Sequence, residues 1–209
     1  MLCVLPTVTT AAYLVTQRVI VFPPRTVPTI LIDRVIPFNP AWVWGYVSLY
    51  LLTPIAPLLT DDRADLWRYT RGLMLCFAVG CACFVLFPVA GPRPSIAPPN
   101  WLYGQIASLD RPYNAFPSLH AACAVYSVVF GQIVWRDSSR SRLRVGLLTA
   151  AWCWVAIILY STIATRQHYF IDLVPGSLLG AFCAALDWKW IRVPQSRIEK
   201  EKANEPSPA

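Results

Sequence analysis

The sequence predicts an all-α integral-membrane protein, a bundle of about six transmembrane helices with a short interfacial loop or helix. Hydrophobic residues make up 56% of the 209 residues and charged residues only 14%, with a mean hydropathy of +0.47. Ordinary soluble domains carry roughly 25% charged residues, so this chain has too few charges to cover a water-facing surface. The same composition excludes a disordered protein, a collagen and a small secreted protein stapled by disulfides.

Long stretches without charge define the predicted helices. A helix needs about 20 apolar residues to cross roughly 30 Å of hydrocarbon. Four runs of that length contain no Asp, Glu, Lys or Arg, and one of them contains His120. A fifth run is interrupted only by Asp172, and a sixth, at the start of the chain, is shorter. The six predicted spans are residues 35–60, 72–92, 112–135, 145–165, 169–186 and 1–17.

The chain is expected to form one membrane domain, residues 1–190, followed by a polar tail, residues 191–209. The first run, residues 1–17, is either a retained helix or a secretory signal. It lacks a basic start and a persuasive small-residue cleavage site, so we favour the retained helix. The tail carries no apolar run, and we expect it to be disordered in the cytoplasm.

The cysteines and the net charge argue against two further classes of function. All seven cysteines lie in apolar runs, and no two have the CxxC spacing of a zinc or redox site, so we interpret them as packing residues. The formal charge is +7 and the pI about 9.2, but the sequence shows no basic face with interleaved aromatic residues. We therefore expect no nucleic-acid partner.

Basic residues gather in alternate loops, which predicts an orientation. With the amino terminus in the cytoplasm, one set of loops carries twelve of the eighteen Lys and Arg residues and the other set carries six. The positive-inside rule places the richer set in the cytoplasm. The loop of residues 91–116 and the turn around Arg166 therefore face away from the cytoplasm, across a plasma or inner membrane.

The loop of residues 91–116 has the composition of a segment at the membrane surface. It is rich in proline and carries Trp101, Tyr103 and Tyr113, residue types that favour the headgroup layer. Apolar residues at helical spacing predict a short interfacial helix: Leu102, Ile106 and Leu109. Whether this helix is a lid over a lipid-sized cleft or an inert connector stays open.

The chain has only two histidines, and both fall at predicted helix ends on the same side of the membrane. His120 lies in FPSLHAA, and His168 lies with Asp172 in TRQHYFID. An ionisable group within a span costs roughly 2.5 to 3.5 kcal/mol on insertion, and it normally faces a cavity or a partner. The three side chains are therefore candidates for one site at the non-cytoplasmic surface.

These three residue types suit phosphoryl transfer through a phosphohistidine. His168 and Asp172 are four residues apart, hence on one helical face, where the carboxylate can accept a proton from one imidazole nitrogen. The other nitrogen of His168 can then attack phosphorus, while Asp172 stabilises the charge. We expect His120 to protonate the departing oxygen as the general acid.

Three further residues are candidates for binding the phosphate oxygens. Ser118 precedes an apolar run and can cap the helix of His120, at a positive helix end that favours phosphate. Arg166 and Arg93 can supply guanidinium groups that clamp phosphate. Arg93 can equally be a simple headgroup anchor.

Three other interpretations remain open. Two histidines and Asp172 could form a facial metal site, although neighbouring arginines would repel a cation. Ser118, a histidine and Asp172 could imitate a serine-hydrolase triad, although Ser118 is better explained as a cap. The chain could also be a catalytically inactive membrane scaffold or lipid-binding protein of the same fold.

Two motifs carry a family resemblance. LDRPYNAFPSLHAA and STIATRQHYFIDLVPG resemble the type-2 phosphatidic acid phosphatase superfamily of membrane lipid phosphatases and phosphotransferases. They look most like the branch of inositol phosphorylceramide synthases and inositolphosphotransferase-like proteins, and the resemblance extends over about residues 35–188. It implies a six-helix bundle, no metal or other cofactor, and an active site at the membrane surface.

The resemblance also implies roles for individual residues. His168 matches the nucleophile of the family, Asp172 its supporting acid, His120 the acid of the middle motif, and Ser118 a further position of that motif.

The sequence departs from the phosphatase branch at two positions. Leu86 stands where that branch has a lysine, and Thr162 where it has an arginine, whose charge Arg166 can supply instead. These departures favour the inositolphosphotransferase-like branch. The expected partners are a membrane lipid phosphate and either water or a hydroxyl acceptor such as inositol. The sequence does not indicate an oligomeric state.

Overall fold

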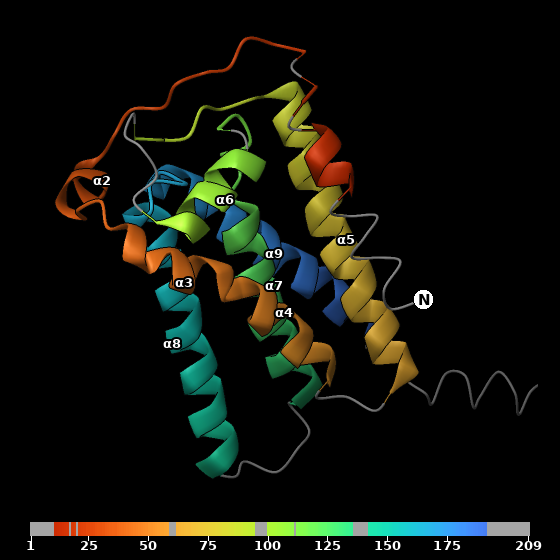
Figure 1. Ribbon diagram of the computed structural model, residues 1–209. Coiled ribbons are helices and arrows are strands. Elements are labelled where there is room, and N and C mark those ends of the chain that lie inside the picture. Colours follow the sequence, from red (N-terminus) through yellow and green to blue (C-terminus); the bar gives the residue numbers. More distant parts are fainter. Residues whose placement is uncertain are drawn as a thin grey trace, which may run out of the picture.

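The computed structural model describes residues 11–16, 18–19, 21–58, 62–94, 100–110, 112–135 and 142–191, with side chains as far as residue 186. Within these residues the chain is helical and has no strand, only isolated bridges (Figure 1). Residues 11–16 are helical as well. The named elements are α2 (Leu31–Val35), η1 (Pro40–Trp42), α3 (Val43–Val47), α4 (Leu49–Leu58), α5 (Arg63–Leu86), α6 (Trp101–Leu109), α7 (Leu119–Val134), α8 (Arg142–Ala164) and α9 (Phe170–Ile191). The predicted all-α bundle is confirmed.

Among the described residues, three stretches are long and apolar enough to cross a membrane, judged by length and composition. They are Pro40–Leu58, Arg63–Leu86 and Arg142–Ala164. Two shorter apolar helices, Leu119–Val134 and Phe170–Leu186, lie beside them in the bundle. Of the predicted first span, residues 1–10 and 17 lie outside the described residues, and so does the predicted tail from residue 192 onward.

Several predicted spans have different ends from the observed helices. The second charge-free run is preceded by charged residues that still belong to α5, where Asp62 caps the helix by accepting a hydrogen bond from the Ala64 N–H at 2.8 Å. Charged residues are disfavoured in lipid, but they do not end a helix. The apolar run therefore begins later in the chain than α5 does. In contrast, residues 112–118 do not join α7, because Pro112 and Pro117 interrupt the helical pattern.

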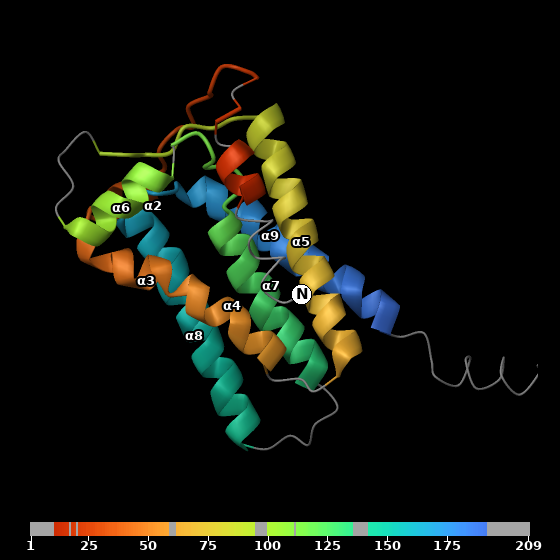
Figure 2. The same ribbon diagram turned by 45° about the vertical axis from the view of Figure 1, so that its right-hand side comes forward.

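Helix α7 lies inside the bundle, with α4, α5, α8 and α9 packed around it (Figures 1 and 2). Its pairing with α9 depends on glycine. A Cβ atom at Gly176 would lie 2.3 Å from the Ser118 carbonyl oxygen, and one at Gly180 would lie 2.2 Å from that of Ala122. The two backbones therefore approach closely only because these positions lack side chains.

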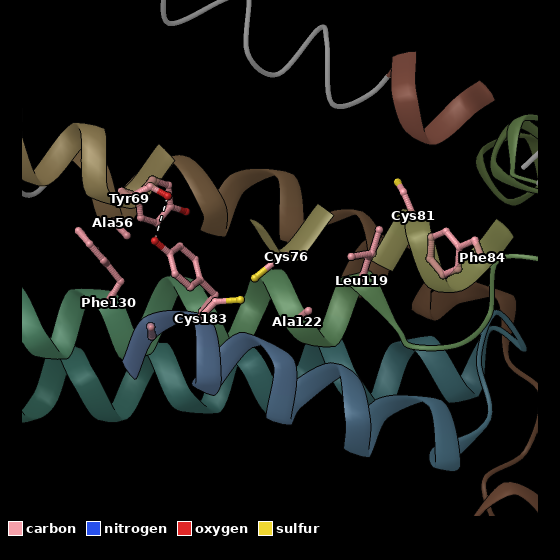
Figure 3. Packing of buried hydrophobic residues seen from close by; sticks show 11 residues of the cluster. Ala56, Tyr69, Cys76, Cys81, Phe84, Leu119, Ala122, Phe130 and Cys183 are labelled. Atoms are coloured by element: carbon pink, nitrogen blue, oxygen red, sulfur yellow. Dashed lines mark hydrogen bonds between the residues drawn. The ribbon is translucent and has the colours of Figure 1, made fainter. Parts of the chain in front are cut away.

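Apolar packing between α5, α7 and α9 runs along the bundle from Phe84 and Leu119 to Phe130. In the cluster of Figure 3, Cys76 on α5 and Cys183 on α9 pack with Ala122 on α7. The hydroxyl of Tyr126 donates to the Tyr69 carbonyl at 2.9 Å, so the buried phenol is satisfied. The cysteines of this cluster thus act as the predicted packing residues.

The predicted interfacial helix is observed as α6. Asn100 caps it by accepting a hydrogen bond from the Tyr103 N–H at 2.8 Å. Its buried side chain is Tyr103, whereas Leu109 is exposed. The Tyr103 hydroxyl donates to the Thr165 carbonyl at 3.1 Å. Helix α6 is therefore anchored to the connection between α8 and α9.

Candidate active site

The start of α7 and the turn between α8 and α9 lie at the same end of the bundle (Figures 1 and 2). The turn holds His168, and the first turn of α7 holds His120. Arg166 adopts a left-handed conformation (φ 54°), which reverses the chain after α8. The Thr162 carbonyl accepts hydrogen bonds from the N–H groups of Gln167 (3.0 Å) and His168 (3.2 Å), so the turn is closed onto the end of α8.

The two imidazole rings are close neighbours. Their centroids are 5.9 Å apart, with an angle of 55° between the ring planes. His168 is buried, with 6% of its surface exposed. At this separation both rings can reach one phosphoryl group placed between them.

The hydrogen bond of His168 defines which nitrogen is available. Its Nδ1 lies 3.0 Å from the Ala115 carbonyl oxygen, and because a carbonyl only accepts, Nδ1 carries the proton. The lone pair is therefore on Nε2. Burial lowers the pKa of His168 to about 4. The Ala115 hydrogen bond raises this pKa and the nearby charge of Arg93 lowers it, but burial has the largest effect. The ring is therefore neutral at physiological pH.

Asp172 contributes differently from the sequence expectation. Its Oδ2 lies 3.9 Å from His168 Nδ1, within ion-pair range but too far for a hydrogen bond. The hydrogen bond expected from the carboxylate is made instead by the Ala115 carbonyl, which the sequence could not place. Asp172 Oδ2 accepts from the Tyr169 N–H at 2.8 Å, and so holds the residue next to His168.

Ser118 is the N-cap of α7, in agreement with its predicted structural role. Its Oγ accepts from the Ala121 N–H at 3.3 Å, and the residue is fully buried. The Ser118 N–H donates to the Asp172 carbonyl at 3.0 Å. This hydrogen bond ties the start of α7, which carries His120, to the start of α9, which follows His168.

The two predicted phosphate-binding arginines are engaged in different ways. Arg166 donates from Nη1 to the Asp33 carbonyl at 2.6 Å and from Nη2 to the Ile36 carbonyl at 3.0 Å. It therefore anchors the segment around α2. Arg93 forms an ion pair with Asp110 at 3.2 Å, and burial raises the pKa of Asp110 against the opposing effect of Arg93.

Unsatisfied polar atoms gather around His168. In the described part of the chain, five buried side-chain atoms have no hydrogen-bond partner: Arg93 Nε, Asn114 Nδ2, His120 Nε2, Gln167 Oε1 and Asp172 Oδ1. Buried polar groups are normally paired, and each exception needs an explanation. Three of the five residues are predicted site residues, and the other two directly precede Ala115 and His168. A polar ligand at this place would satisfy several of them.

A surface pocket lies at the turn that holds His168, and we call it the arginine pocket. Its volume is about 410 Å³, and it is lined by Thr29, Asp33, Arg34, Gly91, Pro92, Arg93, Arg166 and Tyr169. Tyr169 follows His168 in the chain, and Arg93, which lines the pocket, also carries one of the unsatisfied nitrogen atoms. Glycine is required at 91, because a Cβ there would lie 2.9 Å from the Gln167 carbonyl.

Two residues that the sequence analysis missed support the site. Tyr46 stacks on His120, with ring centroids 3.9 Å apart. Asp33 is buried, and its Oδ1 accepts from the Phe170 N–H at 2.8 Å across 137 residues of sequence. A carboxylate inside the apolar stretch TILIDRVI was a signal for Asp33, whereas nothing in the sequence distinguishes Tyr46 from neighbouring aromatic residues.

The described residues do not provide a set of side chains for the metal site that the sequence left open. No group of three or more His, Cys, Asp or Glu side chains there is arranged to hold a metal ion.

Comparison with known proteins yields one family and two relatives. A model described as the PAP2 superfamily matches residues 13–186. An inositol phosphorylceramide synthase of Candida albicans (strain SC5314) is 36% identical over 68 residues, which are 32% of this chain and 12% of that protein. The crystal structure of Aquifex aeolicus LpxE matches with a TM-score of 0.55 and 17% identity, covering 76% of this chain and 93% of that one. The second likeness shows a shared fold.

Proposed function

The chain belongs to the PAP2 superfamily, and on that premise we propose that it is a membrane lipid phosphoryl-transfer enzyme that works through a phosphohistidine on His168. Its apolar helices and its family identify a membrane protein. The observation that carries the proposal is the hydrogen bond from His168 Nδ1 to Ala115, which leaves the Nε2 lone pair free beside His120.

In the first step, Nε2 of His168 attacks the phosphorus of a lipid phosphate. A nitrogen–phosphorus bond forms as the bond between phosphorus and the departing oxygen breaks. His120 in its protonated form gives its proton to that oxygen, so the alcohol leaves neutral. The orphaned Nε2 of His120 fits this role, because a departing oxygen would be its missing partner.

The positive charge that develops on His168 has two stabilising neighbours. The Ala115 carbonyl oxygen holds the Nδ1 proton at 3.0 Å, and the Asp172 carboxylate lies 3.9 Å away. Asp172 is fully buried, and in such surroundings a nearby negative charge stabilises an imidazolium more strongly than it would in water. Asp172 thus supports the phosphohistidine without taking its proton.

The phosphate oxygens need donors. Arg93 Nε and Asn114 Nδ2 are buried and lack partners, so both are proposed to bind these oxygens. Ser118 contributes through the positive end of α7. Arg166 is assigned mainly to holding the turn, because two of its nitrogen atoms are bound to backbone carbonyls.

In the second step a hydroxyl attacks phosphorus, His120 takes its proton, and His168 leaves as the neutral imidazole. Water as acceptor makes the protein a lipid phosphatase, and a hydroxyl such as that of inositol makes it a phosphotransferase. The printed name of the Candida relative, a synthase, supports transfer, but this chain spans only about 12% of that protein.

The active site is proposed to face the non-cytoplasmic side of a plasma or inner membrane. The twofold bias of basic residues between alternate loops supports this side. The test is Ser108→Cys, in α6, in a background in which the seven native cysteines are replaced. Labelling of this variant by an impermeant reagent from outside intact cells would agree with the proposed side. Labelling only after permeabilisation would contradict it.

A product assay tests the proposed reaction. Purified protein in nanodiscs is incubated with a panel of lipid phosphates, with and without inositol, and the released phosphate and phosphorylated products are identified. We expect His168→Gln to abolish product formation. An exposed substitution at the distant start of α5, Arg63→Gln, serves as the matched control. Turnover by His168→Gln equal to that of the unsubstituted protein would remove the nucleophile assignment.

A further inference from the structure

The arginine pocket has an excess of positive charge. Three guanidinium groups line it, from Arg34, Arg93 and Arg166, against the single carboxylate of Asp33. Both oxygens of that carboxylate already accept backbone hydrogen bonds, from the N–H groups of Ile30 at 2.9 Å and Phe170 at 2.8 Å. Asp33 therefore offers little to a ligand and does not neutralise the pocket as a whole.

The charges of Arg34 and Arg166 are uncompensated in the part of the chain that the structure describes. Arg93 is paired with Asp110, whereas neither Arg34 nor Arg166 forms an ion pair with a described residue. Arg34 is exposed, and its Nε and Nη2 each donate a long hydrogen bond, 3.4 Å, to the Thr29 hydroxyl. This guanidinium group is therefore available for an anion.

The balance of donors and acceptors in the pocket selects the class of ligand. Guanidinium groups only donate hydrogen bonds, while the hydroxyls of Thr29 and Tyr169 can donate or accept. A neutral polyol needs as many acceptors as donors, whereas the oxygens of an ionised phosphate only accept. Guanidinium groups also suit the geometry of phosphate oxygens. The pocket therefore matches a phosphate group better than a sugar or inositol ring.

The surroundings of the pocket are those of a lipid headgroup. Leu31 and Val35, which flank Arg34 in α2, are 74% and 70% exposed. In a membrane protein, exposed apolar side chains beside a cationic residue suit the boundary between headgroups and acyl chains. A lipid phosphate at Arg34 could thus keep its chains in the bilayer.

We propose that the arginine pocket is a second phosphate site, which holds a lipid-borne phosphate other than the one that reacts at His168. This inference rests on the proposed function, and it assigns Arg34 as a ligand that no family motif covers. The second phosphate belongs either to the substrate molecule, as in a lipid diphosphate, or to a neighbouring lipid.

Binding to a protein that cannot turn over separates this inference from the proposed reaction. The His168→Gln variant is titrated by calorimetry with a short-chain, soluble lipid monophosphate and, in a second arm, with the matching diphosphate. Two monophosphates per chain would identify a neighbouring lipid as the source. One diphosphate per chain, bound more tightly than a monophosphate, would identify the substrate itself.

In either arm the additional substitution Arg34→Gln is expected to weaken the corresponding binding about tenfold, because one charged contact to phosphate is lost. Arg63→Gln in the same background is the control and should change nothing. Equal affinities with and without Arg34→Gln, in both arms, would overturn the second site. Binding that depends on Arg34, together with no turnover by the unsubstituted protein, would instead retain the site and reject the proposed reaction.

Discussion

The ring of Tyr46 stacks on the imidazole of His120, with centroids 3.9 Å apart and an angle of 26° between the planes. Tyr46 lies on α3 and is 3% exposed, and Tyr50, one turn later, stands nearly perpendicular to the same imidazole, with the two ring centroids 6.4 Å apart. His120 Nε2 has no hydrogen-bond partner. Aromatic contacts thus orient the proposed general acid while leaving this nitrogen free.

Tyr46 is accordingly predicted to act as a positioning residue. Tyr46→Leu should lower kcat by about tenfold to a hundredfold with little change in KM, because small misplacements of a catalytic group cost rate. Tyr46→Phe keeps the stacked ring and should restore most of kcat. The measurement is steady-state phosphate release at several pH values. A phenylalanine variant as impaired as the leucine variant would show that stacking is not the cause.

The low pKa of His168 predicts an unusual acid limb. Burial holds this pKa at about 4, below the ordinary value of 6.5, so the free enzyme keeps a neutral nucleophile down to about pH 4. Between pH 7 and 5, kcat/KM should therefore show no decrease that is caused by protonation of His168. Arg93→Gln removes a nearby positive charge and should move the limb of His168 to higher pH. A decrease of kcat/KM with a pKa near 6.5 that belongs to His168 would show that burial does not lower the pKa of this residue.

The same shift predicts how stability depends on pH. Unfolded His168 takes up a proton near pH 6.5, whereas folded His168 does so only near pH 4. Protonation therefore favours the unfolded chain in this interval, and stability should fall as the pH is lowered from about 6.5 to about 4. Thermal unfolding in detergent measures the effect, and His168→Gln should show a smaller loss of stability over the same range. An equal pH dependence in both proteins would assign it to other groups.

Asp33 is predicted to hold the turn of the nucleophile. Its carboxylate accepts from Phe170 and Ile30, and its carbonyl accepts from Arg166. Asp33→Ala leaves two part-buried N–H groups without partners, at up to about 1–3 kcal/mol each, and should lower both thermal stability and kcat. Asp62→Asn alters an exposed cap at the start of α5 and serves as the control, with kcat unchanged. Normal kcat in the Asp33 variant would exclude the positioning role.

Gly176 is predicted to set the separation of the two histidines. A Cβ there would lie 2.3 Å from the Ser118 carbonyl, so Gly176→Ala should push α9 away from α7, lowering the unfolding temperature and nearly abolishing activity. Gly131→Ala, in α7, meets no atom within 4 Å and should be neutral or slightly stabilising. Equal behaviour of the two variants would show that the close approach is not required.

The sequence was sufficient for the fold class and for bringing the histidines together. Apolar runs indicate helices because lipid requires both length and low charge, and the charge bias between loops places His120 and His168 on one side. Both inferences depend on local composition.

The details of the site depend on contacts between distant segments, which local patterns do not encode. The Ala115 carbonyl reaches His168 because Val89 pairs with Asn114. The Arg166 guanidinium group donates to the carbonyl of Asp33, which is far away in the chain. For the same reason, the sequence predicted Asp172, and not the Ala115 carbonyl, as the acceptor of the His168 Nδ1 proton.

Trapping the covalent intermediate tests the assignment of His168 as the nucleophile. Protein is mixed with a lipid carrying radiolabelled phosphate, quenched within milliseconds, and digested to locate the label. We expect a label on the peptide that contains His168, stable in alkali and lost in acid as is usual for a phosphoramidate, and no label in His168→Gln. A label on another residue, or substrate turnover by the glutamine variant at the unsubstituted rate, would contradict it.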